Sequence, residues 1–365
     1  MSHKFYLGGG SVAAWPDLPL QTFAPVMGLN YRNMLLLQQV SDISSRSEVD
    51  ISTKLGPYKL KVPIMSAAMD SISSELMIRR LAELGALGTL PRAHTKAEFS
   101  KNLSICTRLS RDKIPCIYSV GLATSENESD EYISRGAEVI LIDVAQGGMK
   151  NIVNKAKLIK KKYPKVWIIA GSIANNLTAH MYMDAGIEII KLGVGNGSAC
   201  DTRQQAGTGT PQMSAILDAS LIKGLSIIAD GGLKYPGDAA LALAAGASIV
   251  MSGSILAGTT ETPGKVVNGM KVYRGQASAE FMKDHSISKA HRSIEGVSMK
   301  VPYKGDVENV IEEFSAGLRS AFSYSGAKDL EEFQKRAIFQ YIGENTYQRE
   351  SLPQTNSQGV LATHA

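Results

Sequence analysis

The sequence predicts a single (β/α)8 TIM barrel with an active-site flap inserted after the eighth strand. Three observations indicate this fold: eight short apolar runs, helical segments between most of them, and a length of 365 residues. Each run is apolar almost throughout, as in a parallel strand buried on both faces. Eight such units within about 250 residues match the size of this barrel. A doubly wound open sheet uses the same units, but the count of eight favours the barrel.

The expected strands are residues 62–66, 86–90, 115–120, 138–143, 166–170, 188–192, 225–230 and 247–251. Segments of helical period separate most of them, for example 151–163 and 237–246. A long segment with its own turns follows the last strand and leads to a helix expected over 306–320. In a TIM barrel, an insertion after the eighth strand lies at the catalytic face.

The barrel is expected to span residues 31–347, with the flap at about 273–303. Residues 1–30 are expected to form an irregular N-terminal arm, because consecutive glycines at 8–10 and three prolines interrupt any regular pattern. Residues 348–365 are polar and are expected to form a flexible C-terminal tail. No linker or second core is evident, so we expect one domain.

Composition excludes several classes of protein. The 39 basic and 34 acidic residues leave a net charge of +5, too small to indicate nucleic-acid binding but compatible with a phosphate-bearing substrate. Three cysteines without a CxxC pair do not form a disulfide scaffold or zinc site, and indicate a reducing compartment. Apolar runs are too short to cross a membrane, and the N-terminus lacks the apolar region of a signal peptide, so we expect a cytoplasmic protein.

Barrel enzymes carry their active residues at the carboxyl ends of the strands. The segment after the sixth strand, GVGNGSACDTRQQAGTGTPQ, surrounds Cys200 with glycines and places Arg203 close to it. Thiols held among backbone amides beside a cation are activated nucleophiles, which we favour here over an inert small cysteine. Cys106 in a helical segment and Cys116 in a strand are expected to be buried and inert.

The loops after strands seven and eight commonly bind phosphate in this fold. Here they contain Asp230, Gly231 and Gly232, followed by Ser252, Gly253 and Ser254. Because a carboxylate repels phosphate, Asp230 is interpreted as an acceptor for ribose hydroxyls. The alternative, that Asp230 caps the next helix, is disfavoured because Asp238 already occupies that position.

Several motifs together resemble the IMP dehydrogenase/GMP reductase family. They are SSRSEVDIS (44–52), VPIMSAAMDS (62–71), GVGNGSACDTR (193–203), IADGG (228–232), MSGSILAGTTETPG (251–264), YRGQAS (273–278) and VPYKGDVE (301–308). The resemblance runs from about residue 31 to 336. It implies a (β/α)8 barrel, a homotetramer, and a purine nucleotide 5′-monophosphate as substrate. The pair of CBS modules that dehydrogenases normally insert after strand two has no room between residues 90 and 115.

The resemblance in the flap implies NADPH-dependent reductive deamination of GMP to IMP and ammonia through a Cys200 thioimidate. Thr202 and Glu295 are then the catalytic partners of Cys200. The flap sequence 279–305 contains no Arg-Tyr pair, which dehydrogenases use to activate water. The dehydrogenase reaction, IMP with NAD and water to XMP and NADH, remains the alternative. It is favoured by Ser252 and by AGTTETPG (257–264), which are dehydrogenase-like.

Two further alternatives are a nucleotide-binding barrel without catalysis and an FMN-binding oxidoreductase. Presence of Cys200, Thr202 and Glu295 argues against the first, and nothing in the sequence requires a flavin. Four positions depart from the family pattern, namely Asn196, Asp201, Gln276 and Ile294.

The resemblance and the strand-end rule together imply three sets of binding residues. Substrate-binding residues are Ser66, Ser198, Asp230, Gly231, Gly232, Ser252, Gly253, Ser254, Arg274, Gly275, Gln276, Arg292 and Gly296. Residues expected to bind NADPH (or NAD) are Asp143, Val144, Ala145, Arg292, Ser320 and Ser323. Backbone carbonyls of Gly195, Gly197, Cys200 and Arg203 are expected to bind K+, because a turn of glycines can direct several oxygens at one point. The alternative, that these glycines form only a steric hinge, stays open.

Overall fold

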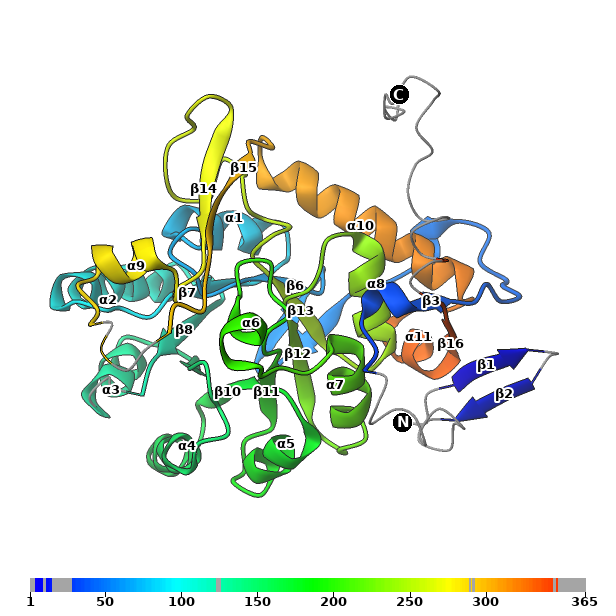
Figure 1. Ribbon diagram of the computed structural model, residues 1–365, viewed down its shortest axis with the longest axis horizontal. Helices are drawn as coiled ribbons and strands as arrows, with labels where there is room; N and C mark the ends of the chain where they lie inside the picture. Colours follow the sequence, from blue (N-terminus) through cyan, green and yellow to red (C-terminus); the bar gives the residue numbers. More distant parts are fainter. Residues whose placement is uncertain are drawn as a thin grey trace.

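Eight parallel strands form a closed barrel at the centre of the computed structural model, which describes residues 4–8, 11–14, 28–122, 126–288, 290, 293–343 and 346 (Figure 1). The strands are β6 (Ile64–Ser66), β7 (Gly88–Leu90), β8 (Cys116–Val120), β9 (Val139–Asp143), β10 (Trp167–Ile173), β11 (Ile189–Leu192), β12 (Ser226–Asp230) and β13 (Ile249–Ser252). Their order is β6-β13-β12-β11-β10-β9-β8-β7, and a parallel bridge between Met65 and Leu87 joins the first to the last. The predicted barrel is therefore confirmed, and the open sheet is wrong.

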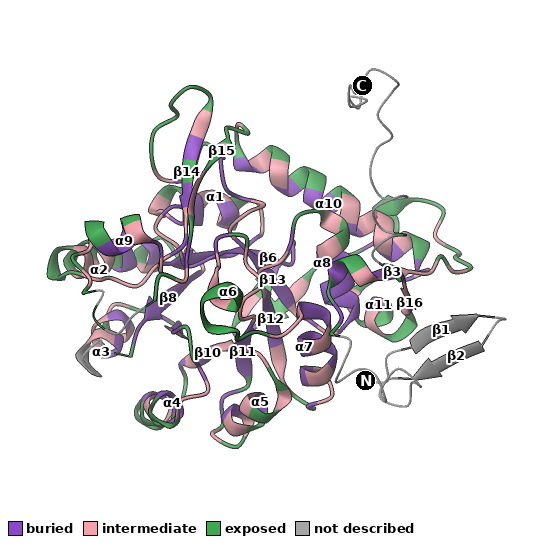
Figure 2. Ribbon diagram, in the orientation of Figure 1, coloured by how far each residue is buried: buried purple, intermediate pink, exposed green. Residues whose placement is uncertain are grey.

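Helices surround the barrel, and each buries one side against it. They are α1 (Glu75–Glu83), α2 (Lys96–Arg111), α3 (Glu126–Ser134), α4 (Lys150–Lys162), α5 (Asn176–Met183), α7 (Gln212–Ala219), α8 (Pro236–Ala244) and α10 (Val307–Tyr324). In α10, Val307, Ile311, Phe314, Leu318 and Phe322 are buried, and their spacing of three or four residues forms one apolar face. Figure 2 shows exposed residues on the outer sides of α4 and α10. No helix in the described part of the chain is long and apolar enough to cross a membrane.

The barrel interior is apolar at the amino ends of the strands and polar at their carboxyl ends. The hairpin of β4 (Thr53–Leu55) and β5 (Tyr58–Leu60) contributes Leu55 and Leu60 to the inner cluster that contains Ile189. Alternate residues of a strand point to the same face, so Lys191 follows Ile189 into the interior. The apolar layer thus fills the barrel below the site, and polar side chains line the site itself.

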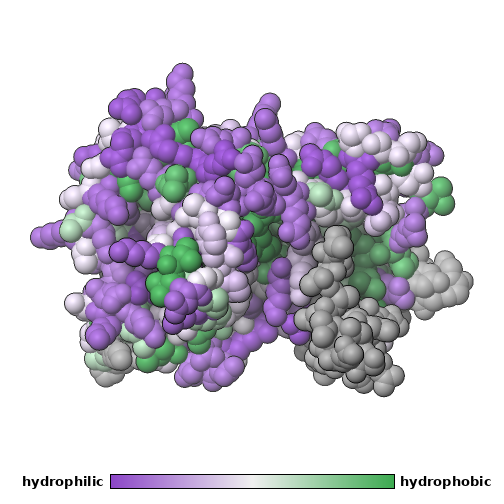
Figure 3. All heavy atoms as spheres, turned by 90° about the horizontal axis from the view of Figure 1, so that it is seen from above, coloured by the Kyte–Doolittle hydropathy of each residue, from purple (hydrophilic) through white to green (hydrophobic). Residues whose placement is uncertain are grey.

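The insertion after β13 contains an antiparallel hairpin and a short helix. Strands β14 (Met270–Arg274) and β15 (Ser298–Pro302) pair with each other, and α9 (Ala279–Asp284) lies between them in sequence. The hairpin projects from the barrel, and α9 lies beside α2 (Figure 1). Seen from the side of this hairpin, the surface is largely hydrophilic (Figure 3). We call residues 273–303 the flap, as predicted from the sequence.

The first residues of the chain are not wholly irregular. Strands β1 (Lys4–Gly8) and β2 (Ser11–Ala14) form a small sheet with β16 (Ile338–Tyr341) and β3 (Met34–Leu36), in the order β2-β1-β16-β3. The expectation of an irregular arm is wrong for these two strands, because β16 from the other end of the chain provides their pairing edge. The remaining described elements are η2 (Tyr31–Asn33), η3 (Arg46–Glu48), α6 (Thr202–Ala206) and α11 (Leu330–Arg336). The expected tail, 348–365, lies outside the described residues.

Candidate active site

A cavity of about 260 Å³ lies at the carboxyl ends of the barrel strands, where the rim loops meet the flap. Its walls bring together most residues that the sequence predicted for the site: Asp143, Val144, Ala145, Gly195, Gly197, Ser198, Cys200, Thr202, Asp230, Gly231, Gly232, Gly253, Ser254, Gly275, Gln276, Glu295 and Gly296. These residues come from six separate stretches of the chain. Their convergence on one cavity follows from the barrel, since all its parallel strands end on the same side.

The expected catalytic residues form a continuous polar chain. The Cys200 sulfur lies 3.2 Å from the Thr202 hydroxyl oxygen, and that hydroxyl donates to Glu295 Oε2 at 2.9 Å. The other carboxyl oxygen, Oε1, accepts a hydrogen bond from Ser293 at 2.7 Å. Cys200 is partly exposed, so a substrate can reach it. The arrangement connects a thiol to a carboxylate through one hydroxyl, a geometry in which the thiol could act as a nucleophile and the carboxylate as an acid or base.

Backbone contacts hold the flap carboxylate against the cysteine loop. The Asp201 amide donates to the Glu295 carbonyl at 2.7 Å, and the Val297 amide donates to the Ala199 carbonyl at 3.1 Å. Gly296 between them is buried against the flap, and a Cβ at this position would come within 2.8 Å of the Ser278 nitrogen. Glu295 and Cys200 are therefore placed by the main chain as well as by the Thr202 hydroxyl.

The other two cysteines take no part in the site. Cys106 in α2 and Cys116 in β8 are both buried in the core. Burial raises the pKa of each thiol, which keeps both protonated and unreactive. The expectation that both cysteines are buried is confirmed.

Two glycine turns form the wall on the side of β12 and β13. Gly231 and Gly232 have φ angles of 87° and 79°, in the left-handed region that favours glycine. A Cβ on Gly253 would lie 2.9 Å from the hydroxyl oxygen of Tyr273, so that phenol closes this wall. Burial raises the pKa of Tyr273 to about 12, and the phenol therefore stays neutral. Close-packed amides next to a neutral hydroxyl suit an anionic group such as a phosphate.

Polar residues of the cavity that the sequence analysis missed include Arg92, Ser172, Lys191 and Tyr273. Arg92 Nη1 donates to the Asp143 carbonyl at 3.1 Å, next to the expected cofactor residues. A signal for Lys191 was present, because it is the one charged residue within the apolar run IIKL. Tyr273 was included in the motif YRGQAS, but only its three neighbours were assigned to the site.

Some expected substrate residues point away from the cavity. Ser66 and Ser252 follow Met65 and Met251, which belong to the barrel interior, so both serines face outward to the helices. The Ser66 hydroxyl accepts from Ser73 Oγ at 2.6 Å, and the Ser252 hydroxyl accepts from the Ile255 amide at 3.1 Å. Both serines therefore support the site from behind its walls.

The remaining expected residues are spread more widely. Arg203 donates to the Thr210 carbonyl at 3.1 Å and does not line the cavity. Ser320 and Ser323 lie on α10 outside the cavity walls, and the Ser320 hydroxyl donates to the Ala316 carbonyl at 3.0 Å. Arg292 lies outside the described residues.

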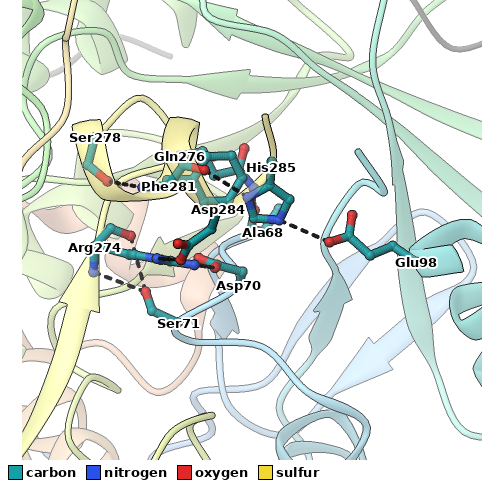
Figure 4. A network of polar contacts seen from close by, with 10 residues as sticks. All are labelled: Ala68, Asp70, Ser71, Glu98, Arg274, Gln276, Ser278, Phe281, Asp284 and His285. Carbon is teal, nitrogen blue, oxygen red and sulfur yellow. Dashed lines mark hydrogen bonds and ion pairs between the residues drawn. The ribbon is translucent and has the colours of Figure 1, made fainter. Parts of the chain in front are cut away.

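Arg274 anchors the flap instead of lining the cavity (Figure 4). Its guanidinium forms ion pairs with Asp70, in the loop after β6, at 2.6 Å and with Asp284 of α9 at 2.5 Å. Nearby, Gln276 donates from Nε2 to the Ala68 carbonyl, which ties the cavity edge of the flap to the same loop. We call Asp70, Arg274 and Asp284 the flap clamp.

A second contact joins α9 to α2. His285 Nε2 lies 3.0 Å from Glu98 Oε1, and its ring stacks on Phe281 (Figure 4). His94 packs edge-on against the same Phe281 ring. Burial, together with the nearby Arg92 cation, lowers the pKa of His94 to about 4. His94 is therefore a neutral residue of this contact at physiological pH.

Within the residues that the structure describes, no cluster of three or more His, Cys, Asp or Glu side chains could hold a metal ion. The cysteine loop offers main-chain carbonyls instead. A ring of neutral carbonyl oxygens is the kind of site that binds K+.

Comparisons with known proteins agree with this site. The family model described as IMP dehydrogenase / GMP reductase domain matches residues 28–353. GMP reductase 1 of Mus musculus is 36% identical over 331 residues, covering 85% of this chain and 94% of that protein. A GMP reductase of Vibrio cholerae serotype O1 is 33% identical over 346 residues, covering 88% and 98%. An inosine-5′-monophosphate dehydrogenase of Nitrosopumilus maritimus is 42% identical over 229 residues, covering 58% and 48%.

The family match spans the whole barrel, the cysteine loop and the flap, which are the parts that build the cavity. The chain therefore belongs to the IMP dehydrogenase/GMP reductase family of purine nucleotide oxidoreductases.

Proposed function

We propose that the protein is a GMP reductase that converts GMP and NADPH to IMP, ammonia and NADP+. The observation that carries this proposal is the chain of contacts from Cys200 through Thr202 to Glu295, at 3.2 and 2.9 Å. The flap sequence has no Arg-Tyr pair to activate water. The relatives named GMP reductase, matched along nearly their full length, support the same choice.

In the first half of the reaction, the Cys200 sulfur adds to C2 of the purine. Glu295, through the Thr202 hydroxyl, delivers the proton that lets the 2-amino group leave as ammonia. The C2–N bond breaks with its electron pair on nitrogen, and a C2–S thioimidate remains. Such an acid step is typically worth about 10²–10⁴-fold in rate.

In the second half, bound NADPH supplies a hydride to C2. The C2–S bond then breaks, its electrons return to the sulfur, and IMP leaves. The overall balance is GMP, NADPH and two protons to IMP, NADP+ and ammonium. Asp143, Val144 and Ala145 line the cavity together with Cys200, so this wall would hold the nicotinamide end.

We assign the nucleotide to the opposite side of the cavity. Gly231, Gly232, Gly253 and Ser254 would bind the 5′-phosphate, and Asp230 would accept hydrogen bonds from the ribose hydroxyls. For the cation, we retain the carbonyls of Gly195, Gly197, Cys200 and Arg203 as the proposed ligands, because neutral carbonyl oxygens suit K+ better than a divalent ion. Loss of activity on replacing K+ by Na+ or a bulky organic cation is expected.

The IMP dehydrogenase reaction is the second candidate. The dehydrogenase relative with 42% identity and the similar segment at 257–264 favour it, and Thr202 with Glu295 could also take a proton from water. One experiment separates the two. Absorbance of the reduced nicotinamide is followed with GMP and NADPH, and separately with IMP and NAD.

We expect consumption of NADPH with stoichiometric IMP and ammonia in the first mixture. Formation of XMP and NADH in the second mixture, with no reaction of GMP, would overturn the reductase and establish the dehydrogenase. If neither reaction occurs but the protein binds a nucleotide tightly, a nucleotide-binding barrel without catalysis would be favoured.

A further inference from the structure

A buried lysine lies between the cavity wall proposed for the cofactor and the side proposed for the nucleotide. Lys191 belongs to β11, and only 5% of its side chain is exposed. Its neighbours along the strand, Ile190 and Leu192, are apolar and fully buried. A charged side chain inside a barrel is costly unless other groups pair with it, so the partners of Lys191 indicate its role.

All three ammonium hydrogens of Lys191 have an acceptor. The Nζ atom lies 2.6 Å from Asp230 Oδ2, 3.2 Å from Asp143 Oδ1 and 2.5 Å from Ser172 Oγ. Burial alone lowers the pKa of Lys191, but the two carboxylates outweigh burial and raise it, so the side chain stays charged. With its three donors engaged, the ammonium has one preferred position.

Neighbouring strands of the barrel pack closely around the Lys191 side chain. The two carboxylates belong to β9 and β12, which are separated by β10 and β11 in the sheet. On β10, a Cβ at Gly171 would lie 2.6 Å from the Lys191 Cβ, so a larger residue would displace the lysine. Lys191 thus makes the side-chain link between the wall proposed for the cofactor and the wall proposed for the ribose.

We propose that Lys191 is a positioning residue that fixes the Asp230 carboxylate for recognition of the ribose hydroxyls, and the Asp143 carboxylate on the cofactor wall. This inference rests on the proposed function, because it assumes a ribonucleotide in the cavity. Asp230 Oδ2 is held by Lys191, which leaves Oδ1 without a hydrogen-bond partner among the described residues and able to accept from a sugar hydroxyl. Without the ammonium, two carboxylates would face each other in one cavity, and Asp230 would lose its fixed orientation.

The experiment measures equilibrium affinity for GMP and for 2′,3′-dideoxy-GMP by titration calorimetry. In the wild type, hydrogen bonds from sugar hydroxyls to a carboxylate predict roughly ten- to a hundredfold tighter binding of GMP. We compare the ratio of the two affinities, GMP over 2′,3′-dideoxy-GMP. In Lys191→Met, which keeps the length of the side chain but not its charge, we expect this ratio to fall close to one.

A matched control is Lys271→Met. Lys271 of β14 is also buried, and its ammonium donates to the carbonyls of Thr259, Thr260 and Thr262 at 2.9, 3.3 and 2.6 Å. Loss of this lysine removes a buried charge of the same kind without touching either carboxylate. We expect Lys271→Met to lose stability but to keep the wild-type ratio.

An unchanged ratio in Lys191→Met would overturn the inference, as would a wild type that binds the two nucleotides equally. If Lys191→Met does not fold, Lys191→Gln serves in its place. A ratio in Lys191→Gln equal to the wild-type ratio would again overturn the inference. Because the ratio is measured at equilibrium, it does not depend on turnover. A failure of the proposed reductase reaction is therefore distinguishable from a failure of this inference.

Discussion

The barrel rim and the flap contribute to the same cavity, but they are held in place by different interactions. The rim residues follow strands of a closed parallel sheet, and the Lys191 side chain that links Asp143 to Asp230 is only 5% exposed. The flap depends on a few backbone bonds to the cysteine loop and on the flap clamp, in which the Asp284 side chain is 56% exposed. The difference indicates a rim that is preorganised for the nucleotide and a flap that completes the site with Glu295, the carboxylate proposed as the catalytic acid.

The largest effect is expected at the point where rim and flap meet. Cys200→Ala removes the nucleophile, and turnover should fall on the order of 10⁴–10⁶-fold, as for other covalent catalysts. GMP binding should largely persist, because the phosphate and ribose contacts lie elsewhere in the cavity. Steady-state kinetics and titration calorimetry measure both quantities.

Cys106→Ala is the control for this variant, since Cys106 is buried in α2 away from the cavity. It should retain near wild-type kinetics. In the wild type, bound GMP should protect Cys200 from alkylation, as followed by mass spectrometry. Substantial turnover in Cys200→Ala would contradict a covalent mechanism.

The second effect tests the flap's chemical contribution. Glu295→Gln keeps the size of the side chain but cannot donate the proton, so kcat should fall roughly 10²–10⁴-fold with little change in GMP affinity. Glu280→Gln, an exposed carboxylate on α9, is the matched control and should leave both unchanged. A normal kcat in Glu295→Gln would show that a residue other than Glu295 acts as the acid or base.

A smaller effect is expected when the flap is loosened without changing its chemistry. Arg274→Met breaks both ion pairs of the flap clamp, and solvent screening keeps the contribution of such partly exposed pairs small. We therefore expect kcat/KM for GMP to fall by about tenfold and hydrogen exchange in α9 to become faster.

Arg80→Met provides the comparison, because Arg80 also bridges two carboxylates, Glu83 of α1 and Glu308 of α10, neither of which belongs to the flap. It should leave both the kinetics and the exchange of α9 as in the wild type. Equal rates of amide hydrogen exchange in α9 of Arg274→Met and of the wild type would show that the backbone contacts alone hold the flap.

The smallest effect concerns the pH dependence of stability where α9 meets the barrel. The pKa of His94 is about 4 in the folded protein and near 6.5 when unfolded, so the unfolded state binds more protons between these values. Stability should therefore fall as pH drops from about 6.5 to 4. In His94→Gln this pH-dependent loss of stability should disappear, as measured by urea unfolding at several pH values.

His180→Gln, at an exposed position on α5, is the control and should keep the wild-type slope. If His94→Gln and the wild type lose stability equally on acidification, the acid sensitivity arises elsewhere in the chain.

Much of the fold and of the site could be predicted from the sequence because those features are local. All eight strands begin within their predicted runs and end no more than three residues beyond them, since each depends on a short apolar pattern and flanking turns. The glycines around Cys200 and after Asp230 likewise mark tight turns that neighbouring residues specify. Thr202 and Glu295 are separated by 93 residues, and their contact was expected only through the family resemblance.

The sequence by itself thus determined the order of the eight barrel strands, the cysteine loop with its candidate nucleophile, and the glycine turns after Asp230. Only the tertiary structure decided that Ser66 and Ser252 face outward, that Arg274 clamps the flap, and that β1 pairs with β16. It also decided that Lys191 joins Asp143 to Asp230. The physical reason is that these contacts depend on how the barrel closes and on which face each strand residue points to. A short window of sequence does not contain that information, because the partners come from distant segments of the chain.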